Sequence, residues 1–320
     1  METPRARRGR RRSRPHRTRS LLHVALAAVT VVGGTAAGTV YVKAQAHSDA
    51  GAVSSSATAS ASTSATTDGE ESVESVTQAA ADHGALLTTA MKAVSVEDGA
   101  DVSVAVLDVD SGVSASYGDG AFDTASIVKV DILATLLLQA QDANRRLTAS
   151  EKTYATAMIE NSDNDSASAL WRIIGRAGGL DAANERLGLT GTEGGDGMLW
   201  GLTQTTAADQ LTLLRQVFGD DSKLSEASRT YLQGLMGQIA ADQHWGVSAA
   251  ADGSRWALKN GWLARSTTGL WDINSIGRVT VDGRACLVAV LSNGNSTKAK
   301  GISLVEAAAK AAVGALSGSG

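Results

Sequence analysis

The sequence has few of the residues that form disulfide bonds and metal sites. One of its 320 residues is a cysteine, Cys286, which excludes an intramolecular disulfide and a metal site built from several cysteines. Cys286 lies in an apolar run, where a cysteine is expected to act as a small buried hydrophobe. The five histidines have no metal-ligand spacing, which argues against zinc. The sequence therefore predicts no metal site.

The chain also lacks an overall excess of basic charge. Its formal net charge is -4, so the composition as a whole does not point to nucleic acid. The arginines crowd into residues 1–19, which also hold both prolines, Pro4 and Pro15, and the remainder is distinctly acidic. A basic segment of this kind can bind nucleic acid, but an apolar stretch follows it here. We therefore expect no nucleic-acid partner.

The apolar stretch, residues 21–42, is long enough to span a bilayer as a helix. Its basic flank should stay in the cytoplasm, which places the bulk of the chain outside. Residues 44–46 read Ala-Gln-Ala and resemble a signal-peptidase site. Residues 1–46 thus fit a cleaved signal peptide and an uncleaved membrane anchor about equally well. Either way we expect a secreted protein or one anchored by a single N-terminal span.

Two further regions follow this leader. Residues 47–70 are rich in serine, alanine and threonine, a composition that cannot build a core, so they are expected to form a flexible linker. Residues 71–320 carry the periodic apolar patterns of a folded domain, without an internal repeat of solenoid spacing. We expect this domain to be a monomer.

The order of patterns within the domain predicts an α/β protein of the α+β type. A helix and two strands come first, a helical block runs from Ser126 to about Leu235, and three strands and a final helix follow. Short turns between neighbouring strands favour antiparallel pairing. The strands are expected at 102–108, 113–117, 254–262, 272–281 and 285–293, and the last helix at 301–316. They predict a five-stranded antiparallel sheet flanked by helices, with an inserted all-α subdomain and a cleft between the two.

The first candidate for chemistry is Ser126, followed three residues later by Lys129 at the start of an apolar helix. Positions i and i+3 share a helix face, so the lysine amine can reach the serine hydroxyl. A buried lysine with a lowered pKa can take the serine proton. The alternative is that Thr124 or Ser126 caps the helix and Lys129 is solvated.

Two further groups of residues are ambiguous when each is taken alone. Ser162, Asp163 and Asn164 fall between two helical runs, where such residues usually cap a helix. In a functional interpretation, Ser162 would pass a proton to a leaving group and Asn164 would hold a substrate amide.

The third group, Lys259-Asn260-Gly261-Trp262, lies in an expected strand. A lysine there normally faces solvent, yet Lys259 could attract a substrate carboxylate. Gly261 would let a ligand approach the backbone closely. The Trp262 backbone N–H could act as an oxyanion donor together with that of Ser126.

The three groups occur in the order S-x-x-K, S-D-N and K-x-G, each on the expected kind of element. Over about residues 75–316 the chain resembles the class A β-lactamase-related serine hydrolases, within the superfamily of β-lactamases and penicillin-binding proteins. This resemblance implies a β-lactamase/transpeptidase-like fold, acyl transfer without a metal or organic cofactor, and a β-lactam or peptidoglycan-peptide substrate. By the same resemblance Ser126 is the nucleophile, Lys129 its base and Ser162 the proton relay, while Asn164 and Lys259 orient the substrate.

The sequence also departs from the class A pattern. Ser162 follows Ser126 by only 36 positions, and K-N-G stands in place of K-T-G or K-S-G. No E-x-x-L-N segment is found, although its glutamate activates the deacylating water in class A enzymes. Glu193 is the only glutamate in the corresponding glycine-rich stretch, where a solvated carboxylate is the better interpretation. The role of Arg265, in a turn after the K-x-G strand, stays open.

Two alternatives to a class A type hydrolase remain. The chain could be a D,D-peptidase or penicillin-binding protein acting on peptidoglycan peptides. It could be a non-catalytic wall-binding or sensor module that kept the fold, which the short loop and K-N-G make credible. Separately, His244 could be a base in a Ser-His scheme, but a lone histidine is more often structural or exposed.

Overall fold

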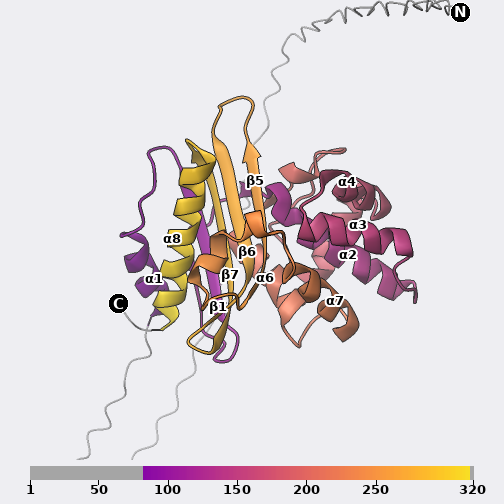
Figure 1. The fold of residues 1–320 in the computed structure, drawn as a ribbon, viewed down its shortest axis with the longest axis horizontal. Coiled ribbons are helices and arrows are strands. Elements are labelled where there is room, and N and C mark those ends of the chain that lie inside the picture. The colour runs from indigo at the N-terminus through magenta and orange to yellow at the C-terminus, as the bar shows by residue number, and fades with distance from the viewer. Residues whose placement is uncertain (1–81, 318–320) are drawn as a thin grey trace, which may run out of the picture. The chain divides into compact units, whose positions relative to one another are not determined.

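A five-stranded antiparallel sheet with the strand order β2-β1-β7-β6-β5 organises the domain in the computed structural model, which describes residues 82–317 (Figure 1). Its strands are β1 (Asp101–Asp108), β2 (Ser114–Tyr117), β5 (Trp256–Ala264), β6 (Trp271–Val281) and β7 (Arg284–Asn295). The leader, the apolar segment 21–42 and the linker 47–70 lie outside the described residues. Among residues 82–317, no helix is both long and apolar enough to cross a membrane.

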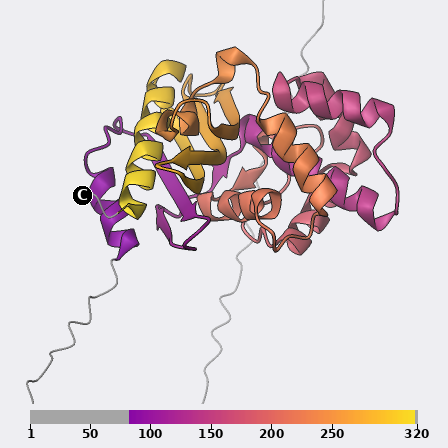
Figure 2. The ribbon, with the colours of Figure 1, turned by 60° about the horizontal axis from the view of Figure 1, so that its bottom comes forward.

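Helices cover both faces of this sheet. On one face, α8 (Lys298–Leu316) contacts β1, β6 and β7 and packs against α1 (His83–Met91). On the other face, α6 (Ala207–Phe218) contacts the same three strands. The remaining helices form a block beside the sheet in both ribbon views (Figures 1 and 2). They are α2 (Val128–Asp142), α3 (Ala149–Glu160), α4 (Asn164–Ile173), α5 (Arg176–Leu187) and α7 (Glu226–Met236).

This architecture confirms the predicted fold class and the position of each strand to within a few residues. The structure also has elements that the sequence did not predict. The short strands β3 (Phe122–Asp123) and β4 (Gln204–Thr205) pair antiparallel, and a 3₁₀ turn, η1 (Ala125–Ile127), precedes α2. The last helix begins three residues earlier than predicted because the Thr297 side chain caps it, accepting a hydrogen bond from Lys300 N.

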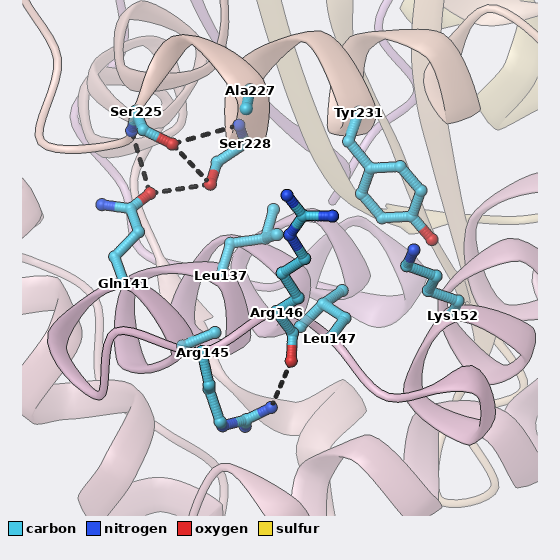
Figure 3. A pocket seen from close by; sticks show the side chains of 11 residues that line it. Leu137, Gln141, Arg145, Arg146, Leu147, Lys152, Ser225, Ala227, Ser228 and Tyr231 are labelled. Carbon is cyan, nitrogen blue, oxygen red and sulfur yellow. Dashed lines mark hydrogen bonds between the residues drawn. The ribbon is translucent and has the colours of Figure 1, made fainter.

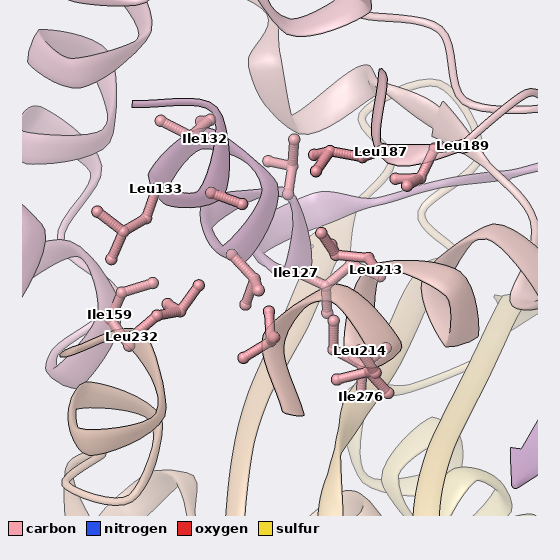
Figure 4. Packing of buried hydrophobic residues seen from close by; sticks show 14 of the residues in the cluster. Ile127, Ile132, Leu133, Ile159, Leu187, Leu189, Leu213, Leu214, Leu232 and Ile276 are labelled. Carbon is pink, nitrogen blue, oxygen red and sulfur yellow. The ribbon is translucent and has the colours of Figure 1, made fainter. Parts of the chain in front are cut away.

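Helix α2 is the centre of the helical block and is buried on almost all sides. A helix that is apolar all round packs inside a protein rather than on its surface. Ile132 and Leu133 belong to a core cluster that also takes in Leu213 of α6 and Ile276 of β6 (Figure 4). This packing fixes the helix that carries Lys129 between the sheet and the other helices.

One carboxylate, Asp131, is buried in this core without a cation. Asn184 of α5 donates a hydrogen bond from Nδ2 to Asp131 Oδ2 at 3.1 Å. Asp131 Oδ1 and Asn184 Oδ1 are both buried and have no hydrogen-bond partner among the described residues. Burial, together with the smaller effect of nearby Asp181 and Asp209, raises the pKa of Asp131 from 3.8 to about 7 although the hydrogen bond from Asn184 opposes this. A protonated Asp131 could donate its hydrogen to Asn184 Oδ1, which would satisfy both unpaired atoms at once.

We predict that this pair makes the stability of the domain depend on pH. Asp131 should stay protonated in the folded chain up to about pH 7, but only up to about pH 4 in the unfolded chain. The contribution of Asp131 to the free energy of unfolding is therefore fully present below about pH 4 and is lost as the pH rises to about 7. The loss should be on the order of 4 kcal/mol.

Urea unfolding at a series of pH values tests this prediction. Asp131→Asn should remove the decline in the free energy of unfolding, because an amide does not ionise. Asp142→Asn is the matched control, since the Asp142 carboxylate pairs with Arg186 at the surface and its pKa is lowered instead. Equal slopes in wild type and Asp131→Asn would contradict the prediction.

Candidate active site

The Ser162 hydroxyl is the point at which the three groups of residues meet. It lies between α3 and α4, and two lysine amines approach its oxygen at the same distance. Lys129 Nζ of α2 and Lys259 Nζ of β5 each lie 3.0 Å from Ser162 Oγ. Ser162 has a positive φ of 55°, which is unusual for a residue with a side chain and costs conformational energy. The fold thus brings S-x-x-K, S-D-N and K-x-G together.

Lys129 is fully buried and its amine is held by the S-D-N segment. Besides Ser162 Oγ, it donates to Ser162 O at 2.6 Å and to Asn164 Oδ1 at 2.7 Å. Burial lowers the pKa of Lys129 from 10.5 to about 7, against the opposing charge of nearby Asp163. Near neutral pH this amine is therefore available in its neutral form, as a general base must be.

Lys259 is also fully buried, on the edge strand β5. Its amine donates to Asn260 O at 2.9 Å as well as to Ser162 Oγ. Burial and the proximity of Lys129 hold the pKa of Lys259 well below its usual value. Among the described residues, no carboxylate forms an ion pair with either amine. Two amines that share one hydroxyl without a counter-ion disfavour each other's charge.

Ser126 sits in the η1 turn, partly exposed, at the start of the buried helix. Its hydroxyl makes no hydrogen bond with any residue of the described range, so the structure places Lys129 on Ser162 and Asn164 rather than on Ser126. Catalytic hydrogen bonds are often long before a substrate is bound. Ala125, directly before it, has a positive φ of 47°. A strained backbone of this kind is frequent at functional sites.

The alternative of helix capping holds for only one of these residues. Neither Thr124 nor Ser126 makes a side-chain capping bond to the helix that follows. Asp163, in contrast, caps α4 by accepting a hydrogen bond from Ser166 N at 2.7 Å. The S-D-N segment therefore combines one structural residue with two residues that contact lysine.

Gly261 lies directly against the backbone around Ser126. A Cβ at this position would lie 2.7 Å from Thr124 O and 2.9 Å from Ser126 N, closer than atoms can approach. The sequence suggested that Gly261 leaves room for a ligand. The structure gives it another reason, since only glycine lets β5 lie against the η1 turn.

The Trp262 side chain lies on the opposite face of the sheet from Ser126. Its ring centroid is 6.0 Å from that of Trp245, and Lys298 Nζ lies 4.2 Å from the Trp262 ring. The Trp262 backbone N–H points in a different direction from its side chain. Asn260 O accepts from Lys259 Nζ, and residues two apart on an antiparallel strand present their N–H and C=O groups to the same side. Trp262 N–H is therefore directed to the free edge of β5.

An ion network that the sequence did not reveal holds the turn that leads to Ser126, and it joins a partly exposed arginine to two buried carboxylates. Arg265 pairs with Asp123, directly before Thr124, and its Nε lies 3.1 Å from Asp272 Oδ2. Burial raises the pKa of Asp272 to about 6 although Arg265 opposes this. Asn274 Nδ2 donates to Asp123 O at 2.8 Å and to Thr124 O at 3.0 Å. Arg265 thus binds two carboxylates of the protein itself.

The segment between α5 and α6 presents an indole to the site. The Trp200 ring lies 5.0 Å from Lys129 Nζ, and its Nε1 donates to Ser168 Oγ at 3.1 Å. Glu193 is exposed and pairs through its backbone with Gln204 in both directions at 2.9 Å. Its carboxylate forms no hydrogen bond or ion pair with the site residues within the described range. The sequence gave no signal for Trp200, because the contact joins elements far apart in the chain.

The other residues raised by the sequence lie outside this site. His244 Nε2 lies 3.0 Å from Ile239 O, and its ring packs edge-on against Trp256 at 4.6 Å, which is a structural role. Cys286 is fully buried in β7, as predicted. Within residues 82–317, no group of three or more His, Cys, Asp or Glu side chains is arranged to hold a metal.

Comparison with known proteins identifies the family and the fold. A model of the "Beta-lactamase enzyme family" matches residues 147–316, more than half of the chain. No curated protein matches the sequence significantly.

Solved structures with the same fold share little sequence with this chain. The TLA-1 extended-spectrum β-lactamase superposes with a TM-score of 0.64 at 17% identity, covering 73% of this chain and 98% of its own. A PBP-A mutant gives 0.63 at 18% identity, with 73% and 97% covered. A class A β-lactamase from Bacteroides cellulosilyticus gives 0.62 at 16% identity, with 74% and 99% covered. The family match and the fold show that this chain is a β-lactamase-like serine hydrolase and belongs to the β-lactamase enzyme family.

Proposed function

We propose that Ser126 is acylated by β-lactams or related amides, as in class A type enzymes. The observation that carries the proposal is the Ser162 hydroxyl, held between two buried lysine amines beside the Ser126 turn. Such an arrangement supplies a neutral amine and a proton relay within a few ångströms of one another. It has no evident structural purpose, because two buried amines without a counter-ion cost stability.

The proposed reaction begins with proton transfer from Ser126 Oγ to the neutral amine of Lys129 as Oγ attacks the substrate carbonyl. The carbonyl becomes a tetrahedral oxyanion, which the backbone N–H groups of Ser126 and Trp262 stabilise. The C–N bond then breaks. Lys129 passes the proton that it took from Ser126 to the Ser162 hydroxyl, and Ser162 donates its own proton to the leaving nitrogen. The product is an ester of Ser126 with the former amide nitrogen protonated.

The positioning roles follow from charge and reach. Lys259, on the edge strand, attracts the carboxylate that β-lactams and peptide C-termini share. Asn164 already accepts from Lys129 through Oδ1, which leaves its Nδ2 free to meet a substrate carbonyl. Gly261 keeps β5, and with it the Trp262 N–H, close to Ser126. These assignments rest on the geometry and on the motif resemblance together.

We further propose that the acyl-enzyme is long-lived, which would make the chain behave as a penicillin-binding protein. Hydrolysis of the ester needs a base that activates water, and the residue that faces Lys129 from the segment between α5 and α6 is Trp200. The PBP-A mutant of similar fold was solved as an acyl-enzyme complex with penicillin G. A D,D-peptidase acting on peptidoglycan peptides is the second candidate. It is favoured because an indole, rather than a carboxylate, faces Lys129 from this segment.

The proposed place of action is outside the cytoplasmic membrane. The basic residues 1–19 and the apolar residues 21–42 support export, and peptidoglycan peptides occur on that side. A single span at 21–42 would hold the domain at the membrane if the leader is not removed, with the linker 47–70 as a spacer. Residues 82–317 are proposed to work as a monomer.

Covalent labelling tests the proposed acylation. Incubation with a fluorescent penicillin should add the mass of one penicillin to the wild-type chain, and Ser126→Ala should abolish the adduct. Ser254→Ala, at an exposed serine far along the chain, is the matched control and should be labelled like wild type. If the wild type is not labelled, or if Ser126→Ala is labelled as strongly as the wild type, the proposal is wrong.

The pH dependence of acylation tests the role of Lys129. Because the neutral amine is the base and its pKa is about 7, the second-order acylation rate should rise about tenfold per pH unit below 7 and level off above it. Lys129→Arg keeps the charge but not the base, so the rate should fall by about 10²-fold or more. Stopped-flow measurement with nitrocefin gives both values. Lys310→Arg, at an exposed lysine, is the matched control and should react like wild type. An acylation rate that does not change between pH 5 and 8, or a Lys129→Arg variant as fast as this control, would contradict the role.

The fate of the acyl group can be followed by mass spectrometry after excess penicillin is removed. The penicillin adduct of the wild type should persist. With nitrocefin, the wild type should give a burst of one equivalent of product and then little further turnover. Trp200→Glu places a carboxylate beside Lys129 and should speed loss of the adduct at least tenfold, whereas Trp200→Phe, which keeps an aromatic ring, should not. If the wild-type adduct disappears as fast as it forms, an effective base exists and the proposed long lifetime is wrong.

A further inference from the structure

A pocket of about 360 Å³ opens in the helical block, away from the residues of the candidate active site (Figure 3). It is formed by the C-terminal half of α2, the connection to α3, the start of α3 and the first turns of α7. Its volume lies at the lower end of the range for small-molecule pockets. No residue of the three motifs lines it.

The inner surface of the pocket is largely apolar. Leu137 of α2 is almost fully buried, and Leu147 and the Tyr231 ring are partly buried against the same core cluster. A second wall is polar but satisfied, because Gln141 Oε1 accepts from both Ser225 N and Ser228 Oγ. The pocket therefore offers an apolar group a surface to contact, without unpaired acceptors on this wall.

The charges at the pocket are positive and only partly balanced. Arg145 is neutralised by Glu151 at 2.8 Å, and the same carboxylate also accepts from Thr148 N at 2.7 Å. Arg146 and Lys152 have no ion-pair partner within the described range, and both line the pocket. The N-terminus of α7 also faces it and adds its positive dipole end. An anion would be attracted to this side of the pocket.

Tyr231 contributes its ring to the pocket rather than its hydroxyl. Its Oη is buried beside Thr156 and has almost no exposed surface, so a ligand in the open pocket would meet the ring. Figure 3 shows Arg146, Lys152 and the Tyr231 ring among the residues that line the pocket.

We propose that this pocket binds a small organic carboxylate with an apolar body, such as a medium-chain alkyl carboxylate. The carboxylate oxygens would accept from Arg146 and Lys152, and the Tyr231 ring would add to the apolar wall. The alkyl body would lie against Leu137 and Leu147. This site is independent of the acylation proposed at Ser126 and stands or falls separately from it.

Titration calorimetry of the full chain tests the proposal with octanoate as the probe. Octanoate should bind saturably at one site per chain. Octanol, octyltrimethylammonium and inorganic phosphate should each bind at least tenfold more weakly, because each lacks the charge, its sign or the apolar body. Absence of saturable octanoate binding, or equal binding of any of the three, would overturn the proposal.

Variants locate the site. Arg146→Gln combined with Lys152→Gln should weaken octanoate binding at least tenfold, and Ala227→Trp, at the pocket wall, should block it. The matched control, Arg172→Gln with Lys310→Gln, removes the same charge at exposed positions elsewhere and should bind like wild type. Thermal unfolding without ligand shows whether each variant is folded. If Ala227→Trp is not folded, the Arg146 and Lys152 double variant tests the site by itself. Unchanged binding by the Arg146 and Lys152 double variant would refute the site.

Discussion

The hydroxyl of Ser162, shared by the amines of Lys129 and Lys259, is the interaction on which the candidate site depends. Each amine lies 3.0 Å from the same oxygen, and no carboxylate pairs with either within the described residues. Both amines are fully buried, so both cannot remain charged without a large cost. The burial that lowers their pKa values costs folding stability, and it also makes Lys129 suitable for its proposed role as a base. A stability cost that is concentrated at a reactive position is typical of active sites.

The surrounding fold explains how this arrangement is held. Helix α2 is buried on nearly every side, so Lys129 cannot turn to solvent. On the sheet side, Gly261 lets β5 touch the η1 turn, and Asn274 and the Arg265 ion network fix the backbone that leads to Ser126. Positive φ values at Ala125 and Ser162 mark where this packing forces the backbone into strained conformations. The site is therefore rigid on both sides of the junction between sheet and helices.

Local patterns sufficed to predict the sheet, the helical block and the three motifs, because each depends on residues near one another in the chain. The strand periods located β1, β6 and β7, and the order of the motifs placed Ser162 and Lys259 near Lys129. The contacts that were missed all join distant segments. Trp200 meets Lys129, Arg265 meets Asp123, and Asn184 meets Asp131 only after folding, and none of these pairs has a local signature. The shortened segment before α6 was recognised, but its indole was not.

The most direct test of the central claim is the ionisation of Lys129 itself. Lysine labelled with ¹³C at Cε can be titrated by NMR in the full chain, and Lys129→Arg assigns the signal. The account predicts a Cε resonance that titrates near pH 7 and disappears in the variant. If the Lys129 resonance titrates near the usual lysine pKa of about 10.4, the amine is charged at neutral pH. It would then not be the base that the site requires.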